Sequence, residues 1–486
     1  MAASEKKWTI GAVRAALTAK KISARELTRD HYAQIERDNP NLNAFLALCP
    51  ERAYAQADKI DAMVGRGAEL PALAGVPVAV KDVISTRDVT TTCGSKILQH
   101  YVPPYDATVV TRLEAAGAVI LGKTNCDEFA MGSSNENSAY GPVRNPVAPD
   151  RVPGGSSGGS AAAVSAGMAT AALGTDTGGS IRQPGALCGI PAMMPTYGRV
   201  SRYGLIALAS SLDRIGPFTN TVSDAATIMG LIAGRDANDS TSALHDVPDY
   251  SVSLDRPVTG LRIGIPSEYF GPGMDPAVRH NIEVGIGSLE KLGCKTVQLK
   301  MPHTDYAIAV YYILLTAEAS SNLARYDGVR YGLREAGDGT LMGMYRATRG
   351  RGFGAEVKRR IILGTYVLSA GYYDAYYRKG QQVRELVTRD FREAFMKVDA
   401  ILTPTSPVPA FKLGERTEDP LAMYLADIYT VTGSLAGVPG ISVPCGKTPD
   451  GLPVGLQIFG PHFGEARVLQ IANAFEKVRA ESGLEN

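Results

Sequence analysis

Residues 76–80 read VPVAV, residues 118–121 read AVIL, and residues 108–116 between them read TVVTRLEAA. Each apolar run is short and bounded by glycine or polar residues, which is typical of a strand buried on both faces, and the intervening segment is helical in pattern. The same alternation continues downstream, with predicted strands at 261–265, 400–402, 441–443 and 454–459 and predicted helices such as 276–292 and 373–398. Strands that alternate with helices over the whole length predict an α/β fold, a layered α/β/α domain around a mixed central sheet.

The N-terminal segment predicts helices that pack on this sheet. Ser23 and Glu26 have the spacing of a capping box ahead of an amphipathic stripe, and a second, alanine-rich helix is predicted at 51–64. No fixed-period repeat and no low-complexity linker interrupts the chain. We therefore expect one large domain over residues 1–486, with residues 1–65 as its N-terminal helical layer.

Composition narrows the class of function. The chain has 50 basic and 49 acidic residues and 45% hydrophobic residues, as in an ordinary soluble enzyme. Because the net charge is close to zero, the chain does not attract a polyanion as a whole, and tight autonomous binding of nucleic acid is not expected. A local basic patch is compatible with this net charge. The six cysteines lie far apart without a C-x-x-C pair, which indicates reduced thiols rather than disulfides or a zinc site.

Targeting segments are also not expected. The first residues, MAASEKKW, include an early acid and have no apolar core of signal-peptide length. The apolar stretch at 160–173 is too short and too polar to span a bilayer. We expect a cytoplasmic protein that does not contact a membrane.

Two motif matches fail on physical grounds. Residues 117–124, GAVILGKT, fit the P-loop expression, but a helix is predicted before Gly117 and an apolar strand lies where flexible phosphate-binding amides are needed. Residues 154–158, GGSSG, fit the nucleophile-elbow pattern, which requires a strand directly before the serine. The preceding residues 145–153 contain three prolines and cannot form a central strand.

Two glycine-serine segments carry the chemistry, GGSSGGS at 154–160 and GTDTGGS at 174–180. Each precedes a predicted helix, at 161–168 and 181–188, so its backbone amides are suited to stabilise an oxyanion. Taken singly, each is an ordinary tight turn. Two such turns that flank one alanine-rich helix and both end in serine favour a catalytic site.

A serine nucleophile needs a base, and no histidine lies near these segments. Lys81 ends the predicted strand 76–80 and is the candidate base. At the end of a strand, a lysine is often a surface residue that extends its charge into water. If Lys81 is buried instead, desolvation lowers its pKa, and a shift from about 10.4 to near 7 needs roughly 4 to 5 kcal/mol.

Residues 154–189, GGSSGGSAAAVSAGMATAALGTDTGGSIRQPGALCG, resemble the amidase-signature family, and Lys81, Ser156 and Ser180 match its Ser-cisSer-Lys triad in spacing. The resemblance implies the amidase-signature fold and an amidohydrolase with Ser180 as nucleophile. Ser156, after a cis peptide bond that follows Gly155, is expected to pass the proton to neutral Lys81. The expected oxyanion hole is formed by the backbone amides of Thr177, Gly178, Gly179 and Ser180. Four nearby side chains are expected to have structural roles: Asp176, Arg182, Ser157 and Ser160.

Within that family, residues 121–142, 356–384 and 419–444 resemble the A subunits of glutamyl-tRNA(Gln)/aspartyl-tRNA(Asn) amidotransferases. This resemblance implies that Arg360 and Asp427 bind the α-carboxylate and α-amine of glutamine, two charges that a buried site must pair. The alternative is that both residues make ordinary salt bridges on helix surfaces. The tyrosines of residues 366–377 are expected to pack in the core.

The same resemblance implies a division of labour between subunits. The A subunit hydrolyses glutamine, and the ammonia reaches a B subunit that converts misacylated Glu-tRNA(Gln), Asp-tRNA(Asn) or both. ATP and Mg²⁺ are used by that partner, so no cofactor or metal is expected in this chain, and a small C subunit completes a heterotrimer. Two alternatives remain open, a stand-alone amidase that acts on small amides and a catalytically inactive scaffold.

Overall fold

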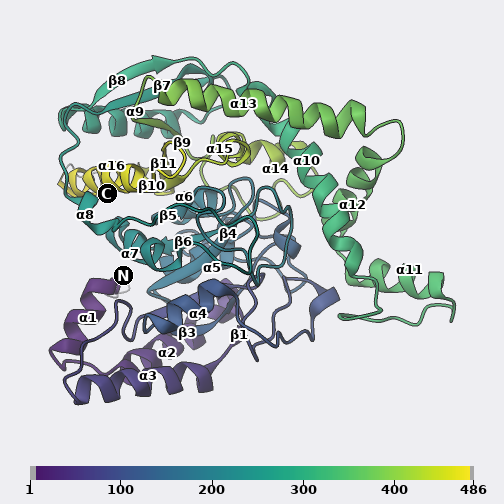
Figure 1. Cartoon of the computed structure of the whole chain (residues 1–486), viewed down its shortest axis with the longest axis horizontal. Helices are drawn as coiled ribbons and strands as arrows, with labels where there is room; N and C mark the ends of the chain where they lie inside the picture. Colours follow the sequence, from purple (N-terminus) through teal and green to yellow (C-terminus); the bar gives the residue numbers. More distant parts are fainter. Residues whose placement is uncertain (1–6, 482–486) are drawn as a thin grey trace.

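The structure, a computed structural model, describes residues 7–481, so the first six and last five residues of the predicted domain lie outside the described residues. A mixed sheet of eleven strands forms its centre, in the order β1-β3-β2-β4-β6-β5-β10-β11-β9-β7-β8, and helices cover both of its faces (Figure 1). The predicted α/β/α class is confirmed. The strands are β1 (Phe45–Leu48), β2 (Pro77–Lys81), β3 (Val119–Thr124), β4 (Ala171–Asp176), β5 (Ala192–Met194), β6 (Arg214–Thr219), β7 (Arg262–Pro266), β8 (Lys295–Leu299), β9 (Ala400–Pro404), β10 (Gly440–Lys447) and β11 (Pro453–Phe459).

Helices fill the connections between these strands. The α-helices are α1 (Ile10–Thr18), α2 (Ala24–Leu42), α3 (Pro50–Gly65), α4 (Thr108–Ala115), α5 (Gly158–Ser165), α6 (Arg182–Cys188), α7 (Val222–Ile232), α8 (Ser251–Leu254), α9 (Pro276–Lys291), α10 (Ala307–Asn322), α11 (Leu341–Gly352), α12 (Ala355–Leu368), α13 (Lys379–Phe395), α14 (Pro420–Tyr424), α15 (Val431–Ala436) and α16 (Glu465–Glu481). A π-helical turn, η6 (Asp374–Arg378), leads into α13, and a 3₁₀ turn, η7 (Leu425–Asp427), follows α14.

The N-terminal helices begin where the sequence predicts. The Ser23 amide donates to Glu26 Oε2 at 2.9 Å and the Glu26 amide donates to Ser23 Oγ at 3.0 Å, so the capping box of α2 is formed. Proline at the first position of α3 fits the helix start because that position needs no amide donor. Both helices lie beside β3 at the edge of the molecule (Figure 1).

Strands β2, β3 and β4 position the predicted catalytic residues. β2 runs parallel to both β3 and β4, and Val80 pairs with Leu173. Because the carboxyl ends of parallel strands meet at the same edge of a sheet, Lys81 at the end of β2 comes close to Thr175 and Asp176 at the end of β4.

One prediction about this region is wrong. Residues 174–176 are not part of a glycine-rich turn but form the end of β4, and the turn begins only at Thr177. Only glycine fits at position 174, because a Cβ there would lie 2.5 Å from Phe218 Cε2 and 2.9 Å from Ser157 Oγ. The close packing of β4 on its neighbours therefore requires this glycine, which on sequence alone is typical of a loop.

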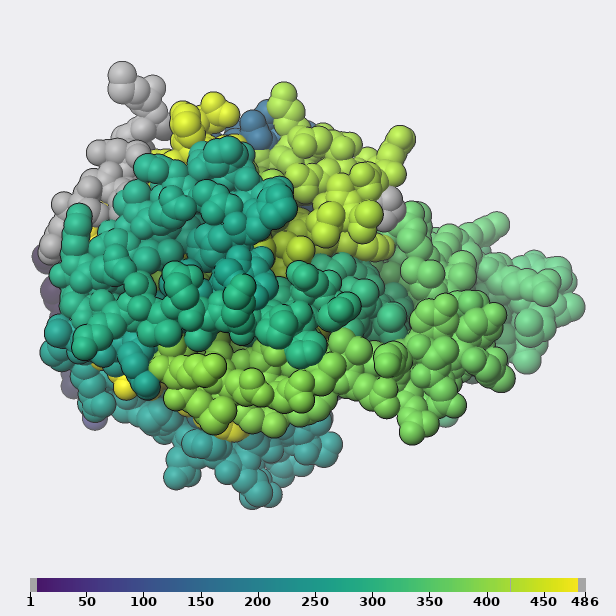
Figure 2. Space-filling model, turned by 90° about the horizontal axis from the view of Figure 1, so that it is seen from above, coloured from purple at the N-terminus to yellow at the C-terminus, as the bar shows by residue number. Residues whose placement is uncertain are grey.

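A second prediction, core packing of the tyrosines in residues 366–377, holds for Tyr377, which packs partly buried against the core, and is wrong for the rest. Four of these side chains are exposed: Tyr366, Tyr372, Tyr373 and Tyr376. They belong to a side lobe, defined here as residues 326–379, which contains α11, α12 and η6 and projects from the main body (Figures 1 and 2). Because the lobe stands away from the sheet, its outer side chains have no protein layer to cover them.

The described cysteines are free and buried, as expected. Among residues 7–481, one helical stretch, Thr304–Arg325, has the length and apolar character of a membrane span, and 56% of its most apolar window is buried inside the protein. Such burial is typical of a core helix, and α10 within this stretch packs against α12 and α13. The stretch at 160–173 instead contributes to α5 and β4.

Candidate active site

Lys81 lies at the end of β2 with its side chain fully buried. Its Nζ contacts three hydroxyls at 2.8 Å each, those of Ser156, Ser157 and Thr175. Burial lowers the pKa of Lys81 from 10.5 to about 8, while Cys126 and then the carboxylates of Asp127, Asp213 and Asp176 partly oppose that shift. Since all three contacts are neutral hydroxyls, a deprotonated amine can accept a proton from one of them.

Ser156 follows Gly155, and the peptide bond between them is cis. Gly155 has no room for a side chain, because a Cβ there would lie 2.2 Å from Asp127 Oδ2. The Asp127 carboxylate accepts hydrogen bonds from the amides of Asn135 at 2.9 Å and Asn137 at 3.0 Å, and the Asp127 amide donates to the Ser156 carbonyl at 3.3 Å. Asp127 thus supports the loop that presents Ser156 to Lys81.

Ser180 lies on the turn between β4 and α6, and its carbonyl accepts a hydrogen bond from the Ser157 amide at 3.3 Å. Its exposed fraction is 7%, whereas Ser156 and Ser157 are 0% exposed. Of the three serines, Ser180 therefore has the most access to a molecule entering from solvent.

The glycines before Ser180 are fixed by contacts that exclude any side chain. A Cβ on Gly178 would lie 2.4 Å from the ring of Tyr311, and a Cβ on Gly179 would lie 2.2 Å from Thr430 Oγ1 and 3.1 Å from Asp427 Oδ1. The predicted oxyanion-hole turn is thereby brought against Asp427. The role of its amides stays a prediction.

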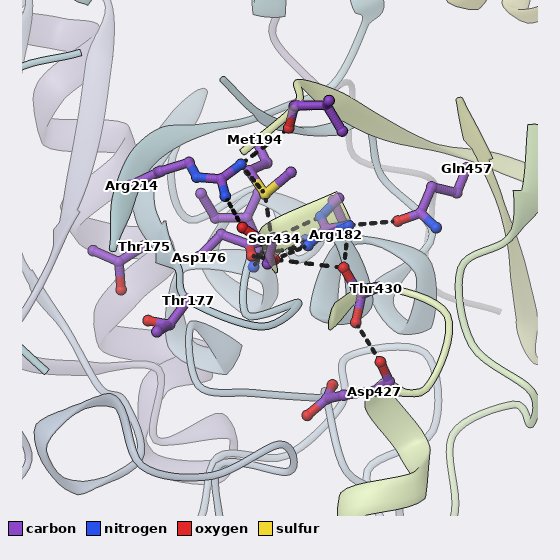
Figure 3. A network of polar contacts seen from close by, with 12 residues as sticks. Thr175, Asp176, Thr177, Arg182, Met194, Arg214, Asp427, Thr430, Ser434 and Gln457 are labelled. Atoms are coloured by element: carbon purple, nitrogen blue, oxygen red, sulfur yellow. Dashed lines mark hydrogen bonds and ion pairs between the residues drawn. The ribbon is translucent and has the colours of Figure 1, made fainter. Parts of the chain in front are cut away.

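A buried ion pair between Arg182 and Asp176 flanks the turn that carries Ser180 (Figure 3). Arg182 at the start of α6 pairs with Asp176 at 3.0 Å, and the same guanidinium donates to the Thr430 carbonyl at 3.0 Å, Ser434 Oγ at 2.8 Å and Gln457 Oε1 at 2.8 Å. Although burial raises the pKa of Asp176, the Arg182 and Arg214 guanidinium groups and the Ile181 amide together outweigh that effect and keep the pKa below its usual value. The expectation that Asp176 and Arg182 brace the turn agrees with these contacts.

Arg360 and Asp427 are both buried, so they are not the surface salt bridges of the alternative interpretation. The Arg360 Nε donates to Glu356 Oε1 at 2.7 Å, and the guanidinium lies beside the stacked rings of Tyr312 and Tyr424, 5.4 and 5.6 Å from their centroids. This side chain lines a hollow of about 110 Å³. The Arg360 guanidinium therefore borders open space.

Asp427 has an oxygen without a partner. Ser133 Oγ donates to Asp427 Oδ2, but Oδ1 is buried and has no hydrogen-bond partner among residues 7–481. Burial raises the pKa of this carboxyl to about 7. Because buried polar atoms in folded proteins are nearly always paired, an unpaired oxygen beside Gly179 indicates a place for a ligand with a polar hydrogen.

Several residues of the site were not singled out from the sequence. Ser157 was expected to be structural, and its hydroxyl does bond to the Thr175 backbone, but it also contacts Lys81 and makes no side-chain capping bond to α5. Thr175, Asp127, Tyr311 and Ser133 had no local signal, because their positions depend on which strands and loops are neighbours. Ser160 is structural as expected, with contacts to Thr124 Oγ1 at 2.7 Å and the Leu173 carbonyl at 2.9 Å.

The two rejected motifs are confirmed as chance matches. Lys123 of the P-loop expression lies inside β3, fully buried, where its Nζ donates to the Ile84 carbonyl and to Thr91 Oγ1 at 2.6 Å each. No strand precedes Ser156 in residues 145–153. Within residues 7–481, no group of three or more His, Cys, Asp or Glu side chains is arranged to hold a metal ion.

Known proteins are similar to this chain over nearly its whole length. A family model described as Amidase matches residues 26–469. The A subunit of the glutamyl-tRNA(Gln) amidotransferase from Koribacter versatilis is 62% identical, covering 97% of this chain and 98% of that protein. The solved structure of the A subunit of the same name from Thermotoga maritima is 44% identical with a TM-score of 0.79, covering 97% of this chain and 94% of that one. The peptide amidase of Stenotrophomonas maltophilia is 32% identical with a TM-score of 0.81, covering 97% and 96%. The chain therefore belongs to the amidase family, the amidase-signature family that its glycine-serine segments resemble.

Proposed function

We propose that this chain is the glutaminase subunit of a tRNA-dependent amidotransferase, a single domain that works in the cytoplasm. The observation that carries the proposal is the buried amine of Lys81, held by Ser156, Ser157 and Thr175 beside the Ser180 turn. The relatives support the choice of reaction. They are named A subunits of a glutamyl-tRNA(Gln) amidotransferase, and the similarity to this chain covers nearly their full length.

In the proposed reaction, Ser180 Oγ forms a bond to the side-chain amide carbon of glutamine. Its proton passes to Ser156, whose own proton passes to neutral Lys81, and the amides of Thr177, Gly178 and Gly179 stabilise the oxyanion. The carbon–nitrogen bond then breaks while the Lys81 ammonium returns the proton to the leaving ammonia. Water cleaves the acyl-enzyme by the reverse relay, which releases glutamate and restores Ser180.

Substrate choice is assigned to Arg360 and Asp427. Glutamine carries a carboxylate and an ammonium at its α-carbon, and a buried site binds such a molecule only if it pairs both charges. The Arg360 guanidinium would bind the carboxylate. The unpaired Asp427 Oδ1 would accept from the ammonium, which leaves the amide end near Gly179 and Ser180.

The ammonia is proposed to go to a B subunit that uses ATP and Mg²⁺ to amidate Glu-tRNA(Gln), Asp-tRNA(Asn) or both, with a small C subunit completing a heterotrimer. In this scheme the chain itself needs no cofactor, and it meets misacylated tRNA mainly through the B subunit. The other two members of the amidotransferase are required for the complete reaction.

The test is glutamine hydrolysis by the purified chain and by the reconstituted complex. We expect slow hydrolysis by the chain alone, faster hydrolysis in the complex, and none in Ser180→Ala. Measurable hydrolysis by a well-folded Ser180→Ala variant would remove Ser180 as the nucleophile. Reconstituted complex that fails to amidate either misacylated tRNA with glutamine would remove the amidotransferase assignment.

A stand-alone amidase that acts on small amides is the second candidate, favoured by the similarity to a peptide amidase. It requires only the triad and not a site for the α-charges of glutamine. Release of ammonia from simple amides at rates above that from glutamine, together with no binding to B and C subunits, would support it. Covalent labelling of Ser180 by a fluorophosphonate separates both candidates from an inactive scaffold.

A further inference from the structure

The side lobe, residues 326–379, carries an unusual concentration of exposed apolar side chains. Among residues 7–481, twenty large hydrophobic residues are exposed, and ten of them lie in this lobe. The most exposed are Ile362 at 68%, Leu341 at 61% and Met342 at 56%. Exposed apolar side chains that gather on one part of a soluble protein mark sites of protein interaction.

Aromatic rings add a preformed cluster to this surface. The rings of Tyr366 and Tyr372 are 4.4 Å apart, and that of Tyr376 lies 5.9 and 6.0 Å from them. All three side chains are exposed and come from the end of α12, the connection that follows it and the turn η6. Tyrosine, methionine and arginine are the residue types enriched in the buried centres of protein interfaces.

Charge on the lobe has one dominant sign. The segment contains ten lysines and arginines against five acids, whereas the whole chain has 50 against 49. Within this segment, seven of the basic residues are exposed, but only two of the acids, Asp338 and Asp374. A partner that fits this surface therefore presents apolar side chains within an acidic rim.

The opposite face of α12 reaches the candidate substrate site. Gly364 packs so closely on α10 that a Cβ there would lie 1.8 Å from the Thr316 carbonyl oxygen. Arg360 lies on this inner face, whereas Ile362 lies two residues on, about 200° around the helix, and points outward. A single helix thus connects the exposed surface to the guanidinium assigned to glutamine.

We propose that the outer face of the side lobe docks a partner protein with apolar side chains and an acidic rim, and that docking fixes α12 and Arg360 for glutamine binding. This inference rests on the proposed function for the identity of the partner. A protein is favoured over RNA because the most exposed apolar side chains of the lobe, Ile362, Leu341 and Met342, are not aromatic: bases do not stack on them, whereas apolar side chains of a protein cover them. Figure 2 shows how far the lobe stands out from the main body, which leaves this face accessible.

The experiment measures the affinity of the full chain for its own B and C subunits by sedimentation velocity. Ile362→Glu and Tyr366→Glu place a carboxylate against the apolar centre of the partner's surface, and each should weaken association at least about tenfold. Leu244→Glu is the matched control, since Leu244 is 79% exposed but lies outside the lobe. Association of the two lobe variants as tight as that of wild type and Leu244→Glu would overturn the proposal.

Glutamine kinetics test the link to Arg360. The isolated lobe variants should hydrolyse glutamine as the isolated wild type does, which shows that they are folded. Addition of B and C subunits below saturation should lower the KM for glutamine in wild type and much less in the variants. An equal drop in KM for all of them would overturn the link.

Two further outcomes would reassign the surface. If the lobe variants lose binding to tRNA while their affinity for the B and C subunits is unchanged, the surface binds RNA. A dimer of the isolated chain that Ile362→Glu dissociates would assign it to a second copy of this chain. Failure of wild type to amidate tRNA with glutamine, while the three subunits still associate, would instead count against the proposed function and not against the docking surface.

Discussion

Removal of the Thr175 hydroxyl tests the assignment of Lys81 as the base. Thr175 Oγ1 is one of the three oxygens at 2.8 Å from Lys81 Nζ. Valine has nearly the same shape as threonine but no hydroxyl, so Thr175→Val removes one acceptor from the ammonium and keeps the packing of β4. A hydrogen bond to a charged group contributes about 1.5–3 kcal/mol, and each pH unit in a titration corresponds to about 1.4 kcal/mol.

The direction of the effect follows from the form of Lys81 that is active. Only the neutral amine accepts a proton, so the rate of glutamine hydrolysis should rise with pH through the pKa of Lys81, which is about 8 in the folded chain. Loss of an acceptor destabilises the ammonium, so the rising limb should move to lower pH by about one to two units. Near neutral pH the neutral fraction of the base therefore increases in the variant, even if kcat on the plateau falls.

The assay is kcat/KM for ammonia release from glutamine at closely spaced pH values from about 6 to 9.5, a range that brackets the pKa of Lys81. Ser160→Ala is the control, because Ser160 is a buried hydroxyl whose hydrogen bonds go to Thr124 and Leu173 and not to Lys81. Its limb should coincide with that of wild type. If the limb of Thr175→Val stays in place or moves to higher pH, Lys81 is not the group whose deprotonation limits the reaction.

Three further predictions concern stability and substrate binding. The folded state holds the Lys81 proton less tightly than the unfolded state. The free energy of unfolding of wild type should therefore rise by about 3 kcal/mol relative to that of Lys81→Met between pH 8 and pH 10.5. Urea unfolding that gives parallel stability curves for the two proteins would contradict this. Gly155→Ala should lose activity and several degrees of melting temperature because the new methyl group meets Asp127 Oδ2 at 2.2 Å, whereas Gly65→Ala, with nothing within 4 Å, should melt like wild type. Asp427→Asn should raise the KM for glutamine at least about tenfold. In wild type that KM should also rise as pH falls below about 7, where Asp427 becomes protonated, and a pH dependence that persists in the Asn variant would disprove the assignment.

Much of the fold and of the candidate site can be read from the sequence because the strongest signals are local. The buried strands at β2 and β3 are apolar runs bounded by glycine or polar residues, and the start of α2 at Ser23 has a recognisable capping box. The candidate base stands out because it ends such a strand. The contact between Lys81 and Ser156 then follows from the resemblance to a known triad, and the structure has it at 2.8 Å.

What could not be predicted depends on contacts between distant segments. Thr175 contacts Lys81 only because β2 and β4 are neighbours in a fixed register, and nothing near Thr175 in the sequence indicates that pairing. Gly174 is typical of a loop and becomes part of a strand because of Phe218, forty-four residues away. Tyr366 was expected in the core because large aromatic residues are usually covered, and the sequence gives no sign that its helix stands outside the main body.

The guanidinium of Arg182 has a consequence for the integrity of the whole protein. It joins Asp176, in the first half of the chain, to Thr430, Ser434 and Gln457, all in the last sixty residues. The segment that holds the nucleophile is thus completed by a part of the polypeptide that is synthesised last. Cleavage in the long connection before β7 cannot yield two separately working fragments. A chain that ends before Thr430 should leave Arg182 without Thr430, Ser434 and Gln457, so activity should emerge only after most of the chain has been synthesised.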